Sequence, residues 1–283
     1  MKKSILIILL FFTNFAFSFE ISSKVIKNAG TVLIEVNKPN ISDVKLTFDK
    51  QNIDFFKNPF KENYYYALLP ISYYQKANEY NIVFSYLENG KKIFKSEQLK
   101  VIKGDYKSET LSVEPGKIKL SKENEERAKK EAAIATKIYR SKSDKILWSE
   151  DFIMPLDSHI TSPFGTSRVY NGDLKSYHGG TDFRAMENTP IKATNSGIVK
   201  ISKNRFYAGG TIVIDHGHGV YSCYFHLNKM NFKEGDFVKR GEIIGLSGST
   251  GRVTGPHLHF TIRINSLQVD PLQAIEVLNS LKF

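Results

Sequence analysis

The residues best suited to chemistry are histidines, and all seven of them lie after residue 158. His178 and Asp182 form the first motif, with two glycines and a threonine between them. Adjacent glycines argue against a helix, so a glycine turn leading into a strand at 181–184 is what would bring the two side chains together. Imidazole and carboxylate groups are typical zinc ligands, although this pair alone is weak support for a metal site.

A second motif is a strand-like run over residues 257–264. Alternation places His257, His259, Thr261 and Arg263 on one face, and Leu258, Phe260, Ile262 and Ile264 on the other. Two neighbouring imidazoles above an apolar floor suit a metal ligand beside an acid or base. Spacing alone leaves open which of His257 and His259 binds the metal, and two surface histidines on an amphipathic strand would give the same pattern.

His226 supplies the third motif, on one face of a strand-like run whose opposite face carries Cys223. Alone, such a histidine is more often structural, and the apolar setting of Cys223 favours a buried, inert thiol. Together, four histidines and one aspartate would provide three zinc ligands and two further imidazoles, which is the donor set of a zinc hydrolase with an open coordination position. Zinc would activate water and polarise a carbonyl, while the remaining imidazoles would transfer protons and stabilise an oxyanion.

Mainly β elements must position these groups. Short glycine-bounded strands across 148–283 predict a compact, glycine-rich all-β barrel or sandwich, followed by a terminal helix at 271–281. Residues 19–105 predict a small β-sandwich that contains no histidine. Residues 106–147 are expected to form a linker, with a surface helix at about 122–139 that Ser121 caps.

The N-terminal segment predicts export. Lys2 and Lys3 precede an apolar run and a small-residue site before Phe19, so residues 1–18 are expected to be a cleaved signal peptide and the mature chain to be periplasmic, without stable membrane insertion. An uncleaved anchor is the alternative, but the run is shorter than the roughly 20 residues needed to span a bilayer. A single cysteine excludes an internal disulfide.

The charge also bears on partners. The formal net charge of +11 favours anionic partners, among which export makes nucleic acid the least suitable. The alternative explanation is that the surface lysines only keep the protein soluble.

Five segments, in this order, resemble the lysostaphin-type (LytM) metallopeptidase family. They are 161–165 (TSPFG), 178–182 (HGGTD), 214–222 (IDHGHGVYS), 225–227 (FHL) and 248–260 (GSTGRVTGPHLHF). The resemblance covers about 156–272 and implies an antiparallel β core with an open groove. It also implies zinc on His178, Asp182 and His259, with His226 and His257 as the catalytic pair.

The amino-acid sequence at 168–172 and 251–254 is more similar to Gram-negative envelope members of this family than to glycyl-glycine lysins. The resemblance therefore implies peptidoglycan stem peptides as substrate, with cleavage of the D-Ala to meso-diaminopimelate cross-link (DD-endopeptidase) and trimming of pentapeptides (DD-carboxypeptidase). Arg168, Arg205 and Arg252 are candidates for binding the peptide carboxylates. Thr261 departs from the acidic residue that many relatives carry after the second histidine, which bears on substrate contacts there.

Two other readings remain open. One is a catalytically silent, cell-wall-binding regulator of other wall hydrolases, because the family includes members that have lost ligands and act only as regulators. Residues 234–245 resemble the hairpin of a biotinyl or lipoyl carrier, but the turn that follows, at 248–256, offers no lysine to modify.

The remaining histidines and the linker complete the expectations. His159, His216 and His218 are interpreted as structural or rim residues. Because the linker is longer than a connection requires, we hypothesise that it restrains access to the groove, so that a chain beginning near Trp148 would cleave faster.

Overall fold

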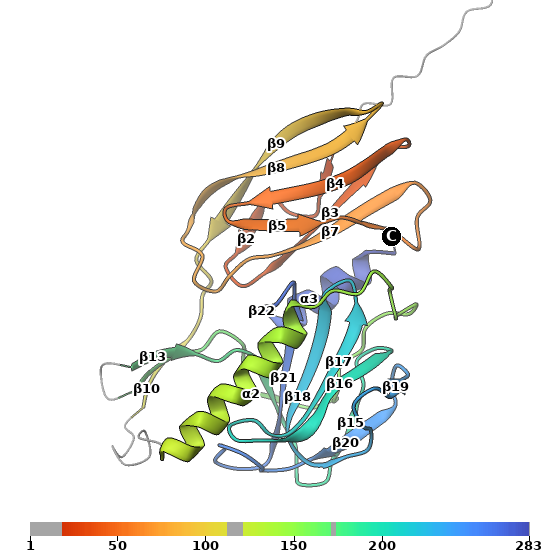
Figure 1. The fold of residues 1–283 in the computed structure, drawn as a ribbon. Helices are drawn as coiled ribbons and strands as arrows, with labels where there is room; N and C mark the ends of the chain where they lie inside the picture. Colours follow the sequence, from red (N-terminus) through yellow and green to blue (C-terminus); the bar gives the residue numbers. More distant parts are fainter. Residues whose placement is uncertain (1–18, 112–120, 171–173, 283) are drawn as a thin grey trace, which may run out of the picture.

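A computed structural model describes residues 19–111, 121–170 and 174–282. The expected signal peptide, residues 1–18, lies outside the described residues. Figure 1 shows two β-rich parts, one above the other, with the C-terminal helix between them. The mainly β class predicted from the sequence is confirmed. Within the described ranges, no helix is both long and apolar enough to cross a membrane.

The N-terminal part is a sandwich of two sheets. One sheet has the order β1-β3-β7-β6, with strands Phe19–Ile21, Thr31–Asn37, Tyr64–Pro70 and Phe56–Lys57. The other has the order β2-β9-β8-β4-β5, with strands Val25–Lys27, Lys91–Ile102, Asn78–Glu88, Ile41–Phe48 and Gln51–Asp54. Ile34 and Leu69 of the first sheet pack against Leu46 and Phe84 of the second in one apolar core. Their burial is the reason the two sheets stay face to face.

The segment expected to be a linker contains two regular elements. β10 (Ser108–Leu111) pairs in parallel with β12 (Ser167–Tyr170), which pairs in turn with β13 (Leu174–Tyr177). Part of the segment is therefore a strand, because its backbone groups find partners at this edge. Helix α2 spans Lys122–Arg140, one residue beyond the predicted end, and the Ser121 hydroxyl accepts a hydrogen bond from the Asn124 backbone N–H (3.3 Å).

The C-terminal part is a ten-stranded antiparallel sheet in the order β11-β14-β21-β18-β17-β16-β19, with β15, β20 and β22 attached to its side. The strand bounds are Ile160–Ser162 (β11), Thr181–Arg184 (β14), Pro190–Lys192 (β15), Gly197–Arg205 (β16), Gly209–Gly217 (β17), Val220–Met230 (β18), Phe237–Val238 (β19), Ile243–Ser247 (β20), His257–Ile264 (β21) and Leu267–Val269 (β22). Helix α3, Pro271–Ser280, follows the cap Asp270. β18 lies at the centre because it pairs with β17, β20 and β21.

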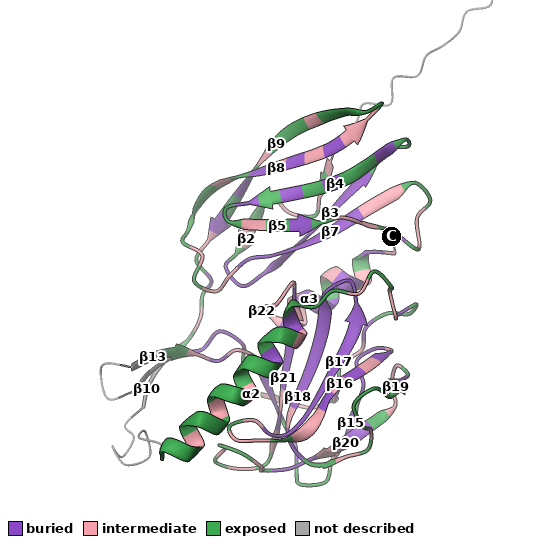
Figure 2. Cartoon of the chain, viewed as in Figure 1, coloured by how far each residue is buried: buried purple, intermediate pink, exposed green. Residues whose placement is uncertain are grey.

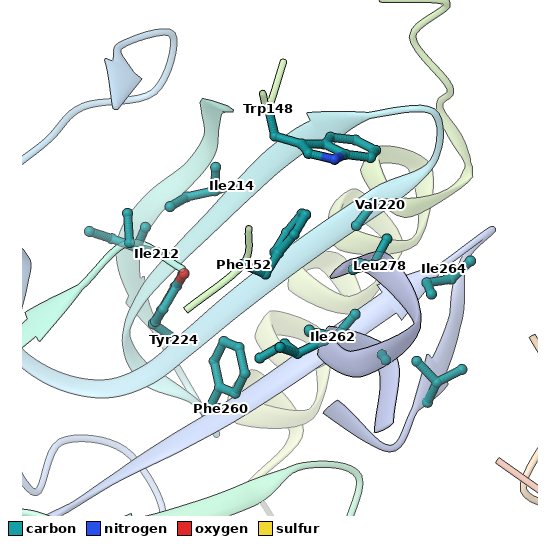
Figure 3. Close-up of a cluster of buried hydrophobic side chains, with 14 of the residues drawn as sticks. Trp148, Phe152, Ile212, Ile214, Val220, Tyr224, Phe260, Ile262, Ile264 and Leu278 are labelled. Carbon is teal, nitrogen blue, oxygen red and sulfur yellow. The ribbon is translucent and has the colours of Figure 1, made fainter. Parts of the chain in front are cut away.

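One apolar core connects the two parts. Figure 3 shows Trp148 and Phe152 packed with side chains of β17, β18, β21 and α3, among them Ile214, Val220 and Ile262. The same cluster continues into the sandwich through Leu33, Tyr66 and Leu68. Figure 2 shows the resulting burial, with β17 and most of β18 and β21 buried at the centre of the C-terminal sheet and α2 mostly exposed. The domain boundaries proposed from the sequence remain predictions.

Candidate metal centre and active-site groove

Three ligand-type side chains meet at one point. Strands β14 and β21 are antiparallel neighbours in a register that sets Asp182 opposite His259. His178 reaches the same point from the residue after β13, through the glycine turn. Its Nε2 lies 3.0 Å from Asp182 Oδ1 and 3.0 Å from His259 Nδ1, while the last two atoms are 2.7 Å apart. The sequence proposed these three residues as ligands, and the fold brings their donor atoms together.

This donor set fits zinc. One ion at about 2.0–2.2 Å from each of three donors can sit above a triangle of this size and keep a further position open. The His178 ring donates its Nδ1–H to Pro163 O (3.0 Å), which leaves a lone pair on Nε2 for the metal. Such a partner fixes both the tautomer and the orientation of a ligand histidine.

Protonation states at the site suit a metal as well. Burial alone would raise the pKa of Asp182, but hydrogen bonds with His178 and His259 outweigh it and hold the pKa far below the usual range. Burial lowers the pKa of His259, although Asp182 opposes this shift. An ionised carboxylate and neutral imidazoles are the forms that bind metal.

Glycine is required in the turn that delivers His178. A Cβ atom on Gly180 would lie 2.5 Å from the carbonyl oxygen of Phe260 and 2.7 Å from Cε1 of His259. Real side chains do not tolerate such distances, so any larger residue would displace β21 or the His259 ring.

Two further imidazoles stand beside the three donors. The rings of His226 and His257 are 4.9 Å apart between centroids, and His257 Nε2 lies 3.8 Å from Asp182 Oδ1. His226 donates Nδ1–H to Thr250 O and His257 donates Nδ1–H to Gly255 O, both at 2.9 Å. Each ring therefore keeps its Nε2 lone pair available. Burial lowers the pKa of His226 to about 4, so this ring is neutral near pH 7.

His226 adopts an unusual backbone conformation. Its φ is 62°, in the left-handed region that residues other than glycine rarely occupy. Its backbone N–H donates to Ala208 O at 2.9 Å, and the Thr250 hydroxyl donates to the next carbonyl, Leu227 O, at 2.8 Å. These contacts hold the imidazole toward the groove, and such local strain is common at functional sites.

A groove of about 1040 Å³ opens over these five residues. Four arginines line it among the residues whose side chains are described, namely Arg140, Arg205, Arg252 and Arg263. Arg205 and Arg252 were proposed from the sequence for substrate binding. Arg168 was the third; its backbone lies on β12, but its side chain falls outside the described part of the molecule.

Two of the arginines, Arg140 and Arg263, were not predicted from the sequence as groove residues. Arg263 could have been found, because alternation already placed it on the histidine face of β21. Arg140 carried no comparable signal, since which side of α2 faces the groove depends on how the helix packs.

The sandwich supports the metal centre from behind. Tyr73 of the sandwich stacks on Tyr177, with ring centroids 3.9 Å apart, and Tyr177 immediately precedes His178. The Tyr73 hydroxyl donates to Gly165 O (3.0 Å), and the Gly165 N–H donates to His178 O (2.8 Å). The position of His178 therefore depends in part on a residue about 100 positions earlier in the chain.

The other histidines and the cysteine lie away from the groove. His216 is fully buried between Ser196 O and the Ser222 hydroxyl, each 2.8 Å from one ring nitrogen. His218 stacks on Phe56 of the sandwich, with ring centroids 3.9 Å apart. His159 is exposed. Cys223 is buried, and burial raises the pKa of its thiol, so it is not a nucleophile.

The part of the chain that carries the site is similar in sequence to known peptidases. The model of peptidase family M23 matches residues 176–271. The peptidoglycan DD-endopeptidase ShyA of Vibrio cholerae is 41% identical over 123 residues, which are 42% of this chain and 29% of that protein. The DD-carboxypeptidase/endopeptidase Mpg of Neisseria meningitidis is 38% identical over 115 residues, 41% of this chain and 26% of that protein. The chain thus matches less than a third of the length of either relative.

A solved structure extends the likeness beyond the peptidase part. A protein of Pseudomonas aeruginosa described as a candidate M23 peptidase superposes with a TM-score of 0.65 at 25% identity, over 88% of this chain and 93% of that one. The sandwich and the C-terminal sheet therefore recur together in another protein. Residues 176–271 are therefore identified as a lysostaphin-type (LytM) peptidase domain of family M23.

Proposed function

We propose that the chain is a zinc-dependent peptidoglycan hydrolase of the periplasm that cleaves the D-Ala to meso-diaminopimelate bond of stem-peptide cross-links. The observation that carries the proposal is the convergence of His178, Asp182 and His259, with His226 and His257 beside them in one open groove. The names of the relatives support the substrate class, since ShyA is a peptidoglycan DD-endopeptidase and Mpg a DD-carboxypeptidase/endopeptidase. Trimming of pentapeptides is proposed as a second activity of the same site.

Zinc would be held by His178 Nε2, Asp182 Oδ1 and His259 Nδ1, and when bound would supply Lewis acidity at the scissile carbonyl. His226 and His257 would move the protons. The Nε2 lone pair of either ring can accept the proton of the attacking water, and the imidazolium so formed can return that proton from Nε2 to the leaving amine. The other ring, 4.9 Å away, is placed to hydrogen-bond the developing oxyanion when it carries a proton.

Electrostatics support an anionic peptide as substrate. Stem peptides carry free carboxylates, and four arginines face the groove. Among the described residues that line this groove, Asp182 is the only carboxylate, and it belongs to the metal site. A groove of one sign concentrates ligands of the opposite sign, with an effect that weakens as salt screens it.

Digestion of purified sacculi tests the proposal. The protein should convert cross-linked muropeptide dimers into monomers, as identified by chromatography and mass spectrometry, and a chelator should stop the conversion until zinc is restored. His259→Ala is the matched control, because it removes one proposed ligand and should abolish zinc occupancy and cleavage together. Cleavage of pentaglycine with dimers left intact would contradict the proposed bond.

The same digestion addresses the regulatory alternative. A protein that only activates other hydrolases would bind sacculi but release no product on its own. Five filled positions with convergent donor atoms favour turnover, because a silent regulator has no need of them.

A further inference from the structure

A second cavity adjoins the active-site groove. It measures about 400 Å³ and lies where three separate elements meet. The sandwich contributes Gln51, Asn52, Ile53 and Ser72; the end of α2 and the residues after it contribute Tyr139, Arg140 and Lys142; the turn between β21 and β22 contributes Asn265, Ser266 and Leu267. Tyr139, Arg140 and Ser266 line both cavities, so the groove continues from the metal centre toward the sandwich.

The arginines of the groove contact α2 at two places, Arg205 at Glu131 and Arg263 at Tyr139. Arg205 donates to Glu131 O on α2 (3.3 Å), and the backbone N–H of Arg252 donates to Tyr207 O on the Arg205 loop (3.0 Å). Arg140 lies nine residues further along α2 than Glu131, which at 1.5 Å per residue is about 13 Å. Figure 1 shows α2 running along the C-terminal sheet toward the sandwich. Arg205 thus contacts the middle of α2, and Arg140 is at the C-terminal end of the helix.

Arg263 contacts the same end of α2 that carries Arg140. Its guanidinium lies over the Tyr139 ring, 4.3 Å from the centroid, and its Nη1 donates to Ser266 O (2.7 Å). It is four residues beyond His259 on β21, or roughly 13 Å at strand spacing. Both residues that hold Arg263 in place, Tyr139 and Ser266, also border the second cavity.

Charge at this end of the groove is unbalanced. The Arg140 side chain is exposed and forms no hydrogen bond or ion pair with the described residues. Lys142 is neutralised by Asp54 at 3.0 Å, whereas no carboxylate among the described residues lines the second cavity. An unpaired guanidinium that lines the same groove as a second one favours an anion, and planar carboxylates suit the guanidinium fork.

We propose that Arg140 and Arg263 form a carboxylate-binding subsite roughly 13 Å from the metal centre, which binds a free carboxylate of the peptide being cleaved. The inference rests on the proposed function and adds a specificity determinant to it. Part of the subsite lies outside the segment that matches the family, because Arg140 and Tyr139 belong to α2 and precede residue 176. It would select substrates with an anionic branch long enough to reach the junction with the sandwich.

Binding of purified muropeptide dimers tests the subsite. In the zinc-loaded His257→Gln chain, in which cleavage is expected to be slow, calorimetry should show that adding Arg140→Gln weakens binding by about 2- to 5-fold, within the range of a single exposed charge contact. Arg140→Lys should recover part of the loss. Lys137→Gln is the matched control, because Lys137 is in the same last turn of α2, exposed, and lines neither cavity.

Amidated dimers provide the second arm. Converting the free carboxylates to amides should weaken binding to the parent chain, and Arg140→Gln should then add no further loss. A loss in Arg140→Gln no larger than in Lys137→Gln would overturn the subsite while leaving the proposed function intact. Failure of the unsubstituted chain to bind or cleave any dimer would instead refute the proposed function, and the subsite with it.

Discussion

His257 and His259 are two residues apart on one strand face, yet we predict opposite consequences when each is replaced. His257→Ala should keep one zinc per chain and lose most activity, whereas His259→Ala should lose the zinc. The difference follows from the donor atoms: His259 Nδ1 is 2.7 Å from Asp182 Oδ1 and 3.0 Å from His178 Nε2, while His257 Nε2 is 3.8 Å from Asp182 Oδ1. Only His259 belongs to the triangle of donor atoms that fits a metal ion.

The expected size of the loss comes from proton transfer. A positioned imidazole contributes roughly 10²–10⁴-fold to the rate, or about 2.7–5.5 kcal/mol of transition-state stabilisation. The fold should tolerate the change, because the His257 side chain is 20% exposed and its hydrogen bond to Gly255 O is worth only about 1 kcal/mol. The activity loss should therefore far exceed any loss of stability.

Three measurements on the same preparations check this prediction. Zinc content per chain is determined by elemental analysis after gel filtration, kcat is determined on purified muropeptide dimers, and thermal unfolding reports stability. Added imidazole should restore part of the rate in His257→Ala, since the position is open to solvent. If His257→Ala lost zinc stoichiometrically, or if His259→Ala retained it, the roles of the two residues would have to be exchanged.

Three further outcomes are expected. Gly180→Ala should lower zinc affinity, because its Cβ would come within 2.7 Å of His259 Cε1; unchanged affinity would show that β21 can yield there, and metal titration measures it. Burial lowers the pKa of His216 to about 4, so the unfolded chain binds a proton more readily than the folded chain between pH 4 and 6.5. The contribution of His216 to the free energy of unfolding should therefore be complete above pH 6.5. It should fall by up to about 3 kcal/mol as the pH drops toward 4. Urea unfolding of chelator-treated protein should show this fall to be smaller in His216→Gln; equal slopes would count against the assignment. If the linker restrains the groove, a chain beginning at Trp148 would cleave faster. We expect slower cleavage, because α2 supplies a groove wall and its Tyr139 covers Cys223 and Tyr221. Cleavage rates on the same sacculi decide between the two outcomes.

The sequence predicted the parts of the site that depend on local geometry. Alternation along 257–264 placed both histidines on one face, and the strand indeed buries Leu258, Phe260 and Ile262 on the other. The glycine turn before Asp182 and the cap at Ser121 were also readable, because each depends on residues only a few positions apart.

Pairing between distant strands was not readable in this way. Asp182 meets His259 only because β14 and β21 adopt one register across 77 residues, and a slip of one residue would turn the histidines to the opposite face. The family resemblance supplied this ligand set in place of a physical derivation. Likewise, the parallel pairing of β10 with β12 arises from an edge that exists only in the folded molecule.

The sequence by itself thus determined the donor set, the β class and the residues that share a strand face, since these follow from short-range periodicity and residue chemistry. Tertiary structure alone decided that α2 walls the groove, that Arg140 and Arg263 both line it, and that Tyr73 of the sandwich supports the His178 loop. The physical reason is that the face a helix or sheet presents to a neighbour depends on burying apolar surface over the whole molecule, and no local pattern carries that information.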